Sequence, residues 1–251
     1  MQLICLESNG AQMIGSMHPG EKNEAIIIYH GYMSASRIGP YRLYFLLANE
    51  LQQLGYNVYR FDCSGCGESL AYFDVTEATF MKNAYDITDY VLDKGYKKVH
   101  VIGHCFGASV ALEIHRRYQT IDKAIAISTV PINSSQMTRL LSPQQMALLK
   151  TQSFIERKSL LIHRSFFEGI ALETELKKQL SVRPQEILLC NPDEDAYVEK
   201  GLLNHIAINA RVAYKNYIDA DHHFLTIRSR KALYNDVCTF INEDNNRLTT
   251  H

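Results

Sequence analysis

The feature that most constrains this fold is a regular alternation of short apolar runs with longer amphipathic segments. Residues 25–32 (AIIIYHGY) form an apolar run that includes a glycine near its end, which is typical of a buried strand. Pro40 to Leu54 follows with leucines at helical spacing and stops at Gly55. Because strands that alternate with helices pair in parallel through right-handed crossovers, this pattern predicts an α/β fold with a mostly parallel sheet.

The same alternation continues to the C-terminus, with one interruption. Further strands are predicted at 57–64, 97–105, 123–128, 186–190 and 210–218, and further helices at 78–94, 106–118 and 229–241. The interrupting segment, residues 134–184, is too long for a simple connection, and its apolar residues fit two or three amphipathic helices. We therefore expect one discontinuous core domain, residues 1–133 and 185–251, with a helical cap inserted at 134–184.

Composition narrows the classes of protein to consider. With 46% hydrophobic residues the chain can build a core, and its net charge of −1 gives no electrostatic reason to bind nucleic acid. No apolar run approaches the roughly 18 residues of a membrane span, and the N-terminus lacks the basic start and apolar centre of a signal peptide. Six cysteines are too few for a disulfide framework in a chain of 251 residues. We expect a cytoplasmic protein with free thiols.

A candidate nucleophile lies where one predicted strand meets the next helix. The strand at 97–105 runs into GHCFG, residues 103–107, which has the pattern glycine, any residue, nucleophile, any residue, glycine. Composition alone predicts roughly 0.016 chance occurrences of this pattern in the chain. The alternative is that Cys105 is a buried structural thiol, as most free cysteines are. A thiol at a helix N-terminus is favoured as thiolate, which supports the reactive interpretation.

The sequence resembles the α/β-hydrolase superfamily in this motif and in two other segments, and the resemblance spans nearly the whole chain. His30-Gly31 ends the strand that carries the oxyanion loop in such proteins, and residues 61–69 (FDCSGCGES) are similar to the family segment D-x-x-G-x-G-x-S. The usual serine is replaced by Cys105, as in the dienelactone-hydrolase branch, which normally lacks such a cap. Residues 36–62 look more like bacterial capped acyl hydrolases encoded with surface-polysaccharide or natural-product pathways.

The resemblance implies that a catalytic acid follows the nucleophile and that a base comes last. In the penultimate strand and its exit loop, residues 186–198, Asp195 fits best because the apolar Val198 follows three residues later. Asp193 stays open, and Glu194 fits less well. All three also suit a polar turn that caps a helix.

The base is expected in residues 217–225 (YIDADHHFL), which are similar to the family segment I-P-G-A-x-H-F-F. Aligning Phe224 with that segment favours His223 as the catalytic base, and His222 remains the alternative. The resemblance also places the oxyanion on the backbone N–H groups of Tyr32 and Phe106.

The remaining cysteines and histidines suggest no further chemistry. Cys63 and Cys66 form a C-x-x-C pair without nearby partners for a metal or a redox reaction, so we expect them to be structural. His104 occupies a position that is often histidine in the family without being catalytic. No other histidine has metal-ligand spacing, so neither a metal nor another cofactor is predicted.

A cysteine nucleophile favours thioester cleavage or acyl transfer over simple ester hydrolysis, since its acyl-enzyme is itself a thioester that amines attack readily. The cap has a net charge of +4, which suits coenzyme A, phosphopantetheine or an acidic acyl carrier protein, although solvated helix faces would look the same. Its basic residues are Arg139, Lys150, Arg157, Lys158, Arg164, Lys177, Lys178 and Arg183, and its acidic ones are Glu156, Glu168, Glu173 and Glu175. The first expectation is therefore a thioesterase or acyltransferase. The alternatives are a dienelactone-type ester or lactone hydrolase and a non-catalytic binding protein on the same fold.

Overall fold

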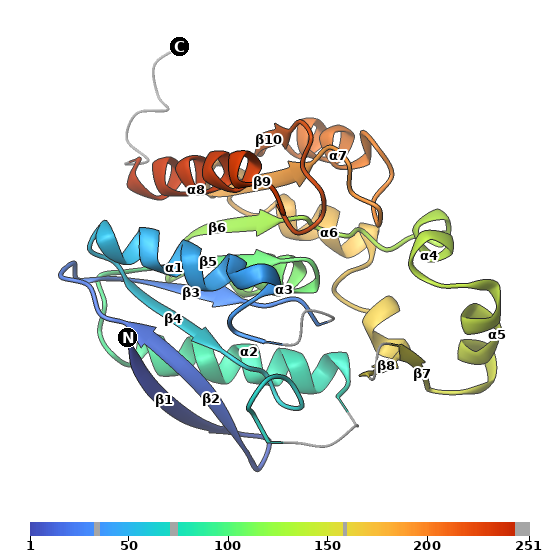
Figure 1. Ribbon diagram of the computed structural model, residues 1–251, viewed down its shortest axis with the longest axis horizontal. Helices are drawn as coiled ribbons and strands as arrows, with labels where there is room; N and C mark the ends of the chain where they lie inside the picture. Colours follow the sequence, from blue (N-terminus) through green and yellow to red (C-terminus); the bar gives the residue numbers. More distant parts are fainter. Residues whose placement is uncertain (33–35, 71–74, 158–159, 244–251) are drawn as a thin grey trace.

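The centre of the molecule is an eight-stranded sheet with helices on both faces (Figure 1). The computed structural model describes residues 1–32, 36–70, 75–157 and 160–243. The strands of this sheet are β1 (Gln2–Ser8), β2 (Ala11–His18), β3 (Glu24–Tyr29), β4 (Asn57–Phe61), β5 (Lys98–His104), β6 (Ile121–Ile127), β9 (Ile187–Pro192) and β10 (Ala213–Tyr217). The helices are α1 (Leu43–Gln53), α2 (Glu77–Leu92), α3 (Phe106–Arg117), α4 (Ser134–Leu140), α5 (Pro143–Thr151), α6 (Glu173–Leu180), α7 (Leu202–Ala210) and α8 (Ile227–Asn242).

The strand order is β1-β2-β4-β3-β5-β6-β9-β10, and all pairs from β4 to β10 are parallel. In the middle of the sheet, Ile27 of β3 lies opposite Tyr59 of β4 and Val101 of β5. This arrangement confirms the predicted α/β fold with a mostly parallel sheet. The first two strands were not predicted; they form an antiparallel hairpin, and β2 also pairs antiparallel with β4.

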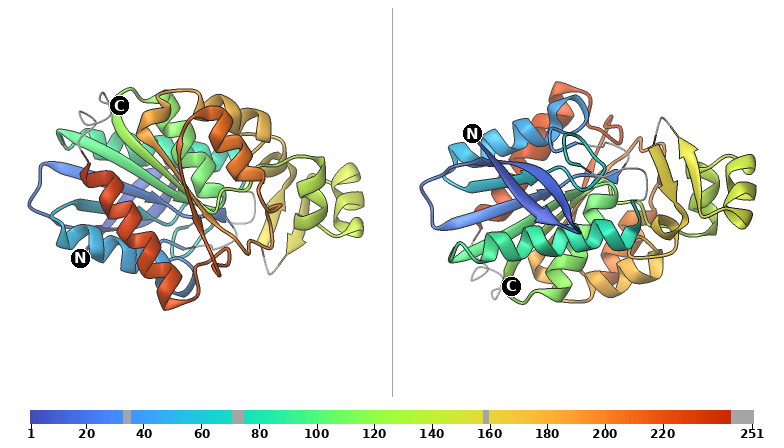
Figure 2. Two further views of the ribbon diagram at one scale, coloured as in Figure 1. Left: turned by 90° about the horizontal axis from the view of Figure 1, so that it is seen from above. Right: turned by 90° about the horizontal axis from the view of Figure 1, so that it is seen from below.

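Side chains alternate between two apolar layers because successive residues of a strand point to opposite faces. In β3, Ile26 and Ile28 belong to the layer that contains α1 and α8. Ala25, Ile27 and Tyr29 belong to the layer that contains α2, α3, α6 and α7. Figure 2 shows α8 in front of the sheet from one side and α2 in front of it from the other. Both faces of the central strands are therefore buried, which explains their nearly continuous apolar sequence.

Residues 134–184, here called the cap segment, are not purely helical as predicted. They contain α4, α5 and α6, but also a hairpin of two strands, β7 (Phe154–Arg157) and β8 (Leu160–His163), and a short 3-10 helix at Arg164–Phe167. The hairpin, α4 and α5 lie to one side of the sheet, whereas α6 packs against α3 and α7 (Figure 1). The division of the chain into core and cap stays a prediction.

The parallel strands point their carboxyl ends toward the cap segment. The loops after β3, β5, β9 and β10 meet at this edge of the sheet, which is where ligands bind in open α/β sheets. No helix of the described residues is long and apolar enough to cross a membrane.

Candidate active site

Cys105 occupies a sharp turn between β5 and α3. Its backbone has φ 57° and ψ −123°, in a region that non-glycine residues seldom adopt. A Cβ atom on Gly103 would lie 1.8 Å from the carbonyl oxygen of Gly107, and one on Gly107 would lie 2.4 Å from that of Tyr29. Both glycines are therefore required for α3 to start this close to β3 and β5, and the turn exposes the thiol at the sheet edge.

The imidazole beside this thiol belongs to His222. Its Nδ1 lies 2.7 Å from Oδ2 of Asp195, and His222 and Cys105 line the same cavity. The other carboxylate oxygen of Asp195 accepts from the backbone N–H of Tyr197 at 2.8 Å. The expectation that His223 pairs with Asp195 is therefore wrong: the loop after β10 turns so that the fully buried Phe224 packs against Tyr217, and His222 faces the acid.

The electrostatics of the site favour a protonated His222. Burial alone lowers the pKa of His222, but the charge of Cys105 and the hydrogen bonds that the ring makes to Asp195 and Cys105 outweigh it and raise the pKa to about 10. At this pKa the imidazole of His222 is protonated at neutral pH.

A buried network fixes the main chain of His222. Its carbonyl oxygen accepts from Ser128 Oγ at 2.9 Å and from His104 Nε2 at 2.8 Å. Since a carbonyl only accepts, His104 carries its proton on Nε2, and its Nδ1 accepts from the Tyr44 hydroxyl at 2.8 Å. Burial, followed by the charge of His222, holds the pKa of His104 well below its usual range, so His104 stays neutral. His104 thus supports the loop, as expected of a non-catalytic position.

Asp193 and His223, the other candidates for acid and base, lie farther from the Asp195–His222 pair. Asp193 forms an ion pair with Lys200 at 2.7 Å on the surface, away from the imidazoles. The ring of His223 lines the cavity, with its centroid 5.0 Å from that of His222.

Three histidines of the described residues, His104, His222 and His223, have nitrogen atoms within 4.8 Å of one another, a grouping that the sequence did not suggest. They fit a metal poorly because both nitrogens of His104 are engaged, by Tyr44 and by the His222 carbonyl. The nitrogens of His222 are held by Asp195 and Cys105.

A cavity of about 120 Å³ opens beside Cys105 and His222. Its walls are mostly apolar and come from the ends of the strands and from the cap segment: Tyr32, Phe106, Val130, Ile132, Leu140, Ile162, Phe166, Phe167, Ala171 and Tyr197. An engineered cavity of about 150 Å³ binds benzene, so this space suits a small apolar group rather than a long chain.

The two residues expected to form the oxyanion hole also lie at this cavity. Phe106 is the first residue of α3, and Tyr32 follows β3; both are buried. The Tyr32 ring stacks on Phe166 with centroids 4.2 Å apart, and Phe166 in turn meets the edge of Phe106 at 4.9 Å. Residues 33–35, which follow Tyr32, lie outside the described residues.

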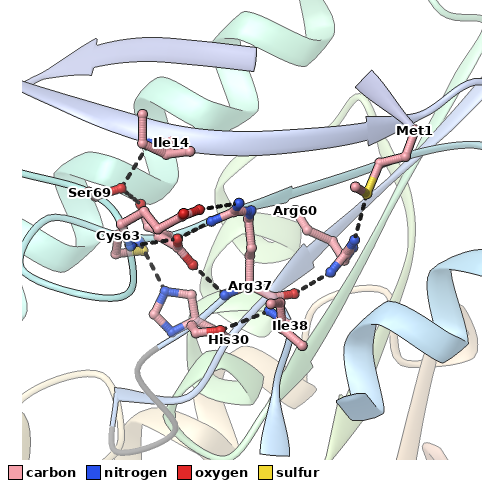
Figure 3. Close-up of polar contacts among 11 residues, drawn as sticks. Met1, Ile14, His30, Arg37, Ile38, Arg60, Cys63 and Ser69 are labelled. Carbon is pink, nitrogen blue, oxygen red and sulfur yellow. Dashed lines mark hydrogen bonds and ion pairs between the residues drawn. The ribbon is translucent and has the colours of Figure 1, made fainter. Parts of the chain in front are cut away.

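Polar contacts join the segment 61–69 to residues that follow β3 (Figure 3). The backbone N–H of Cys63 donates to Nε2 of His30 at 3.0 Å, and the buried Asp62 carboxylate binds the Arg37 guanidinium. Gly67 leaves room for that carboxylate, because a Cβ there would lie 2.3 Å from it.

The C-x-x-C thiols in this segment are buried and protonated. Burial raises the pKa of Cys63 well above its usual value and that of Cys66 to about 12. Neither thiol lines the cavity.

Four of the eight basic residues of the cap segment form ion pairs, three of them with glutamates already counted in its net charge of +4. Arg164 pairs with Glu168, Lys177 with Glu173, Lys178 with Glu175 and Arg183 with Glu186. Lys158 lies outside the described residues, as does the side chain of Arg157.

Comparison with known proteins agrees with this geometry. The sequence model of a family described as alpha/beta hydrolase fold matches residues 24–153. Est1E from Butyrivibrio proteoclasticus, solved with ferulic acid bound, is similar with a TM-score of 0.80 and 15% identity, over 95% of this chain and 97% of that chain.

Two further solved structures are similar. The Pyrococcus furiosus esterase Pf2001 has a TM-score of 0.72 and 18% identity, over 96% of this chain and 89% of that one. The thioesterase domain from the curacin biosynthetic pathway has a TM-score of 0.67 and 16% identity, over 94% and 99%. No curated protein sequence matches this chain significantly.

Proposed function

Because this chain belongs to the alpha/beta hydrolase fold family, we propose that it is an acyl-transfer enzyme with a cysteine nucleophile, acting as a thioesterase or acyltransferase. Cys105 is the nucleophile, His222 the base and Asp195 the acid that orients the base. The backbone N–H groups of Phe106 and Tyr32 hold the oxyanion.

The observation that carries this proposal is the Asp195–His222 pair, whose atoms lie 2.7 Å apart and whose histidine lines the same cavity as Cys105. Asp195 fixes Nδ1 of the ring as the protonated nitrogen and so directs Nε2 toward the thiol. The same relation of nucleophile, base and orienting acid serves acyl transfer on several unrelated folds.

In the first half-reaction the thiolate sulfur of Cys105, whose proton is held by His222, attacks the acyl carbonyl carbon. The negative charge moves to the carbonyl oxygen, where two backbone N–H groups stabilise it. His222 then gives its proton to the departing thiol or alcohol as the bond to that group breaks. The acyl group remains on Cys105 as a thioester.

In the second half-reaction His222 removes a proton from water or another acceptor, which attacks the thioester. The Cys105 sulfur leaves and the product dissociates. With water the reaction is hydrolysis, and with an amine or alcohol it is acyl transfer.

A second candidate function, hydrolysis of a neutral ester or lactone, is favoured by the walls of the cavity. They are mostly apolar, which suits a neutral acyl group. Est1E, solved with ferulic acid, is an example of a similar fold with a small aromatic acid bound. Coenzyme A and carrier-protein thioesters remain the first candidates because of the cysteine nucleophile.

Intact-mass measurement of acyl-enzyme adducts tests the proposal. Wild-type protein and Cys105→Ala are incubated with a panel of acyl thioesters and matched nitrophenyl esters. We expect an adduct of the acyl mass on wild-type protein, mapped to Cys105, and none on the variant. Adducts and turnover with esters alone would support the ester hydrolase. Neither adduct nor turnover across the panel would favour a binding protein and would contradict the proposal.

A further inference from the structure

We propose that the cap segment positions the catalytic groups as well as lining the cavity, through Tyr32 on the oxyanion side and Gln136 on the acid side. This inference rests on the proposed function, since the groups positioned are those of the acyl-transfer mechanism. The two side chains act on different steps, which makes them separable by experiment.

Tyr32 connects the loop after β3 to the hairpin of the cap segment. Its hydroxyl donates to the carbonyl oxygen of Leu161 in β8. Its ring stacks on Phe166, which follows the same hairpin. The backbone N–H proposed to hold the oxyanion thus belongs to a residue whose side chain is fixed by the cap segment, so a displacement of β8 displaces that donor.

Gln136 connects α4 to the loop that carries the acid. Its side chain is completely buried, while Ser135, Thr138 and Arg139 of the same helix are exposed. With its amide oriented to satisfy both partners, the nitrogen donates to the carbonyl of Tyr197 at 2.8 Å and the oxygen accepts from the N–H of Glu199 at 3.3 Å. A buried amide is costly unless it is paired, and this one is paired with main chain on both sides.

A single residue, Tyr197, connects Gln136 to the acid Asp195. Tyr197, whose carbonyl accepts from Gln136, uses its own N–H to donate to Oδ1 of Asp195 at 2.8 Å. The other oxygen of Asp195 holds His222. Loss of the Gln136 contact therefore frees the loop that sets the angle of the carboxylate to the imidazole.

Other hydrogen bonds hold α4 and the segment that follows the hairpin. Asn133 caps α4 by accepting from the N–H of Gln136, and its amide nitrogen donates to Glu173 of α6 at 2.7 Å. On the hairpin side, Glu77 of α2 accepts from the N–H of Ile170 at 3.0 Å.

Two measurements separate the two positioning residues. Alkylation of Cys105 by iodoacetamide, followed against pH, reports the thiolate–imidazolium pair and needs no oxyanion hole. Steady-state turnover of an acyl ester or thioester depends on both the Cys105–His222 pair and the oxyanion hole. Tyr85→Phe on α2 and Gln144→Met, at an exposed position of α5, serve as matched controls because neither residue lines the cavity.

For Tyr32→Phe we expect kcat to fall by about tenfold while the alkylation profile stays that of wild type. Removal of an oxyanion donor costs about 10²–10³ in kcat, and this variant only loosens the donor. The ring stack on Phe166 is kept, so KM should change little.

For Gln136→Met we expect the rise of alkylation with pH to move to higher pH, and kcat to fall by about fivefold, because Asp195 stabilises the imidazolium less well. Gln136→Leu removes the same two hydrogen bonds without adding a charge and should give the same shift. It serves as the test if Gln136→Met does not fold.

The outcomes distinguish this inference from the proposed function. Variants that match Tyr85→Phe and Gln144→Met in both measurements, alongside an active wild type, would refute the positioning role. If wild-type protein turns over no ester or thioester, the proposed function fails. The alkylation profiles of wild type and Gln136→Met would then still decide whether the cap segment positions the Cys105–His222 pair.

Discussion

At the scale of single residues, exposure and reactivity rank the cysteines differently. Cys5 is exposed and Cys105 only partly so, while Cys63, Cys66 and Cys190 are buried. Cys105 alone among these lies beside the imidazole of His222 in the described structure. At pH 7 and limiting iodoacetamide we expect Cys105 to be labelled at least about tenfold faster than Cys5, since the thiolate is the reacting form. Peptide mapping measures this ratio. Faster labelling of Cys5 would show that His222 does not activate the thiol.

The assignment of the base predicts unequal effects in the histidine pair. His222→Ala should reduce kcat by about 10³ or more, because proton transfer and thiolate formation are both lost. His223→Ala should cost less than about tenfold, because Asp195 hydrogen-bonds His222 and His223 lines the wall of the cavity. Steady-state kinetics on one substrate decides between them, and equal losses would refute the assignment.

A parallel comparison tests the acid. Asp195→Asn should lower kcat by up to about 10⁴, since an amide holds the wrong imidazole tautomer. Asp193→Asn should leave kcat nearly unchanged, because Asp193 is engaged with Lys200 at the surface. A greater loss for Asp193→Asn would place the acid elsewhere on this loop.

The histidine was misassigned from the sequence because two motif landmarks disagree by one residue. Counting from Phe224 selects His223, whereas counting from Ala220 as A-x-H selects His222. In the structure Ala220 and Phe224 are both completely buried, and Phe224 has a positive φ of 52°. The backbone between them turns in a way that no side-chain pattern specifies. The proposed nucleophile Cys105 directly follows β5, and the proposed acid Asp195 lies three residues after β9; the sequence marks both strands clearly.

At the scale of elements, the turn from β5 into α3 is the feature most sensitive to substitution. Gly103→Ala would place a methyl group against the Gly107 backbone, so we expect the free energy of unfolding to fall by about 3 kcal/mol, with loss of activity. Gly95→Ala is the matched control: its φ is +77° but nothing lies within 4 Å, so only backbone strain of about 1 kcal/mol is expected. Urea unfolding gives both values. Equal costs would show that the close approach of α3 is not tight.

The sequence predicted the buried elements better than the exposed ones. The central strands are nearly continuous apolar runs because both of their faces are buried. The helices α1, α2, α3 and α8 have apolar residues at helical spacing because one face of each is buried. The β1–β2 hairpin was missed, although Asn9-Gly10 at its turn is a typical hairpin pair; both residues have positive φ. The β7–β8 hairpin was assigned to a helix because Ile155 and Ile162 are buried in a run too short to reveal its period.

At the scale of the whole molecule, buried neutral histidines predict sensitivity to acid. Burial lowers the pKa of His104 and, with Arg183 as the second cause, that of His115 to about 3. An unfolded chain takes up both protons below about pH 6.5, whereas the folded protein does not, so stability falls as pH decreases from 6.5. His222 adds no slope in this range, because its raised pKa leaves it protonated in both states.

Burial also lowers the pKa of His18 to about 4 and that of His30, so four histidines act in this way. Between pH 6.5 and 5 the free energy of unfolding should therefore fall by up to about 5 kcal/mol per pH unit. His115→Gln should remove about a quarter of that slope. Urea unfolding at several pH values measures both, and a stability independent of pH in this window would contradict the burial argument.

The order of the strands along the chain also determines when each part of the site is synthesised. Cys105 is made long before β9 and β10, and β6 is an open edge of the sheet until β9 pairs with it. At roughly 5–20 residues per second, the nascent chain carries this cysteine for about 10 s before His222 is added. Under the proposed mechanism, Cys105 therefore gains its activating base only after the strands that precede His222 have been made.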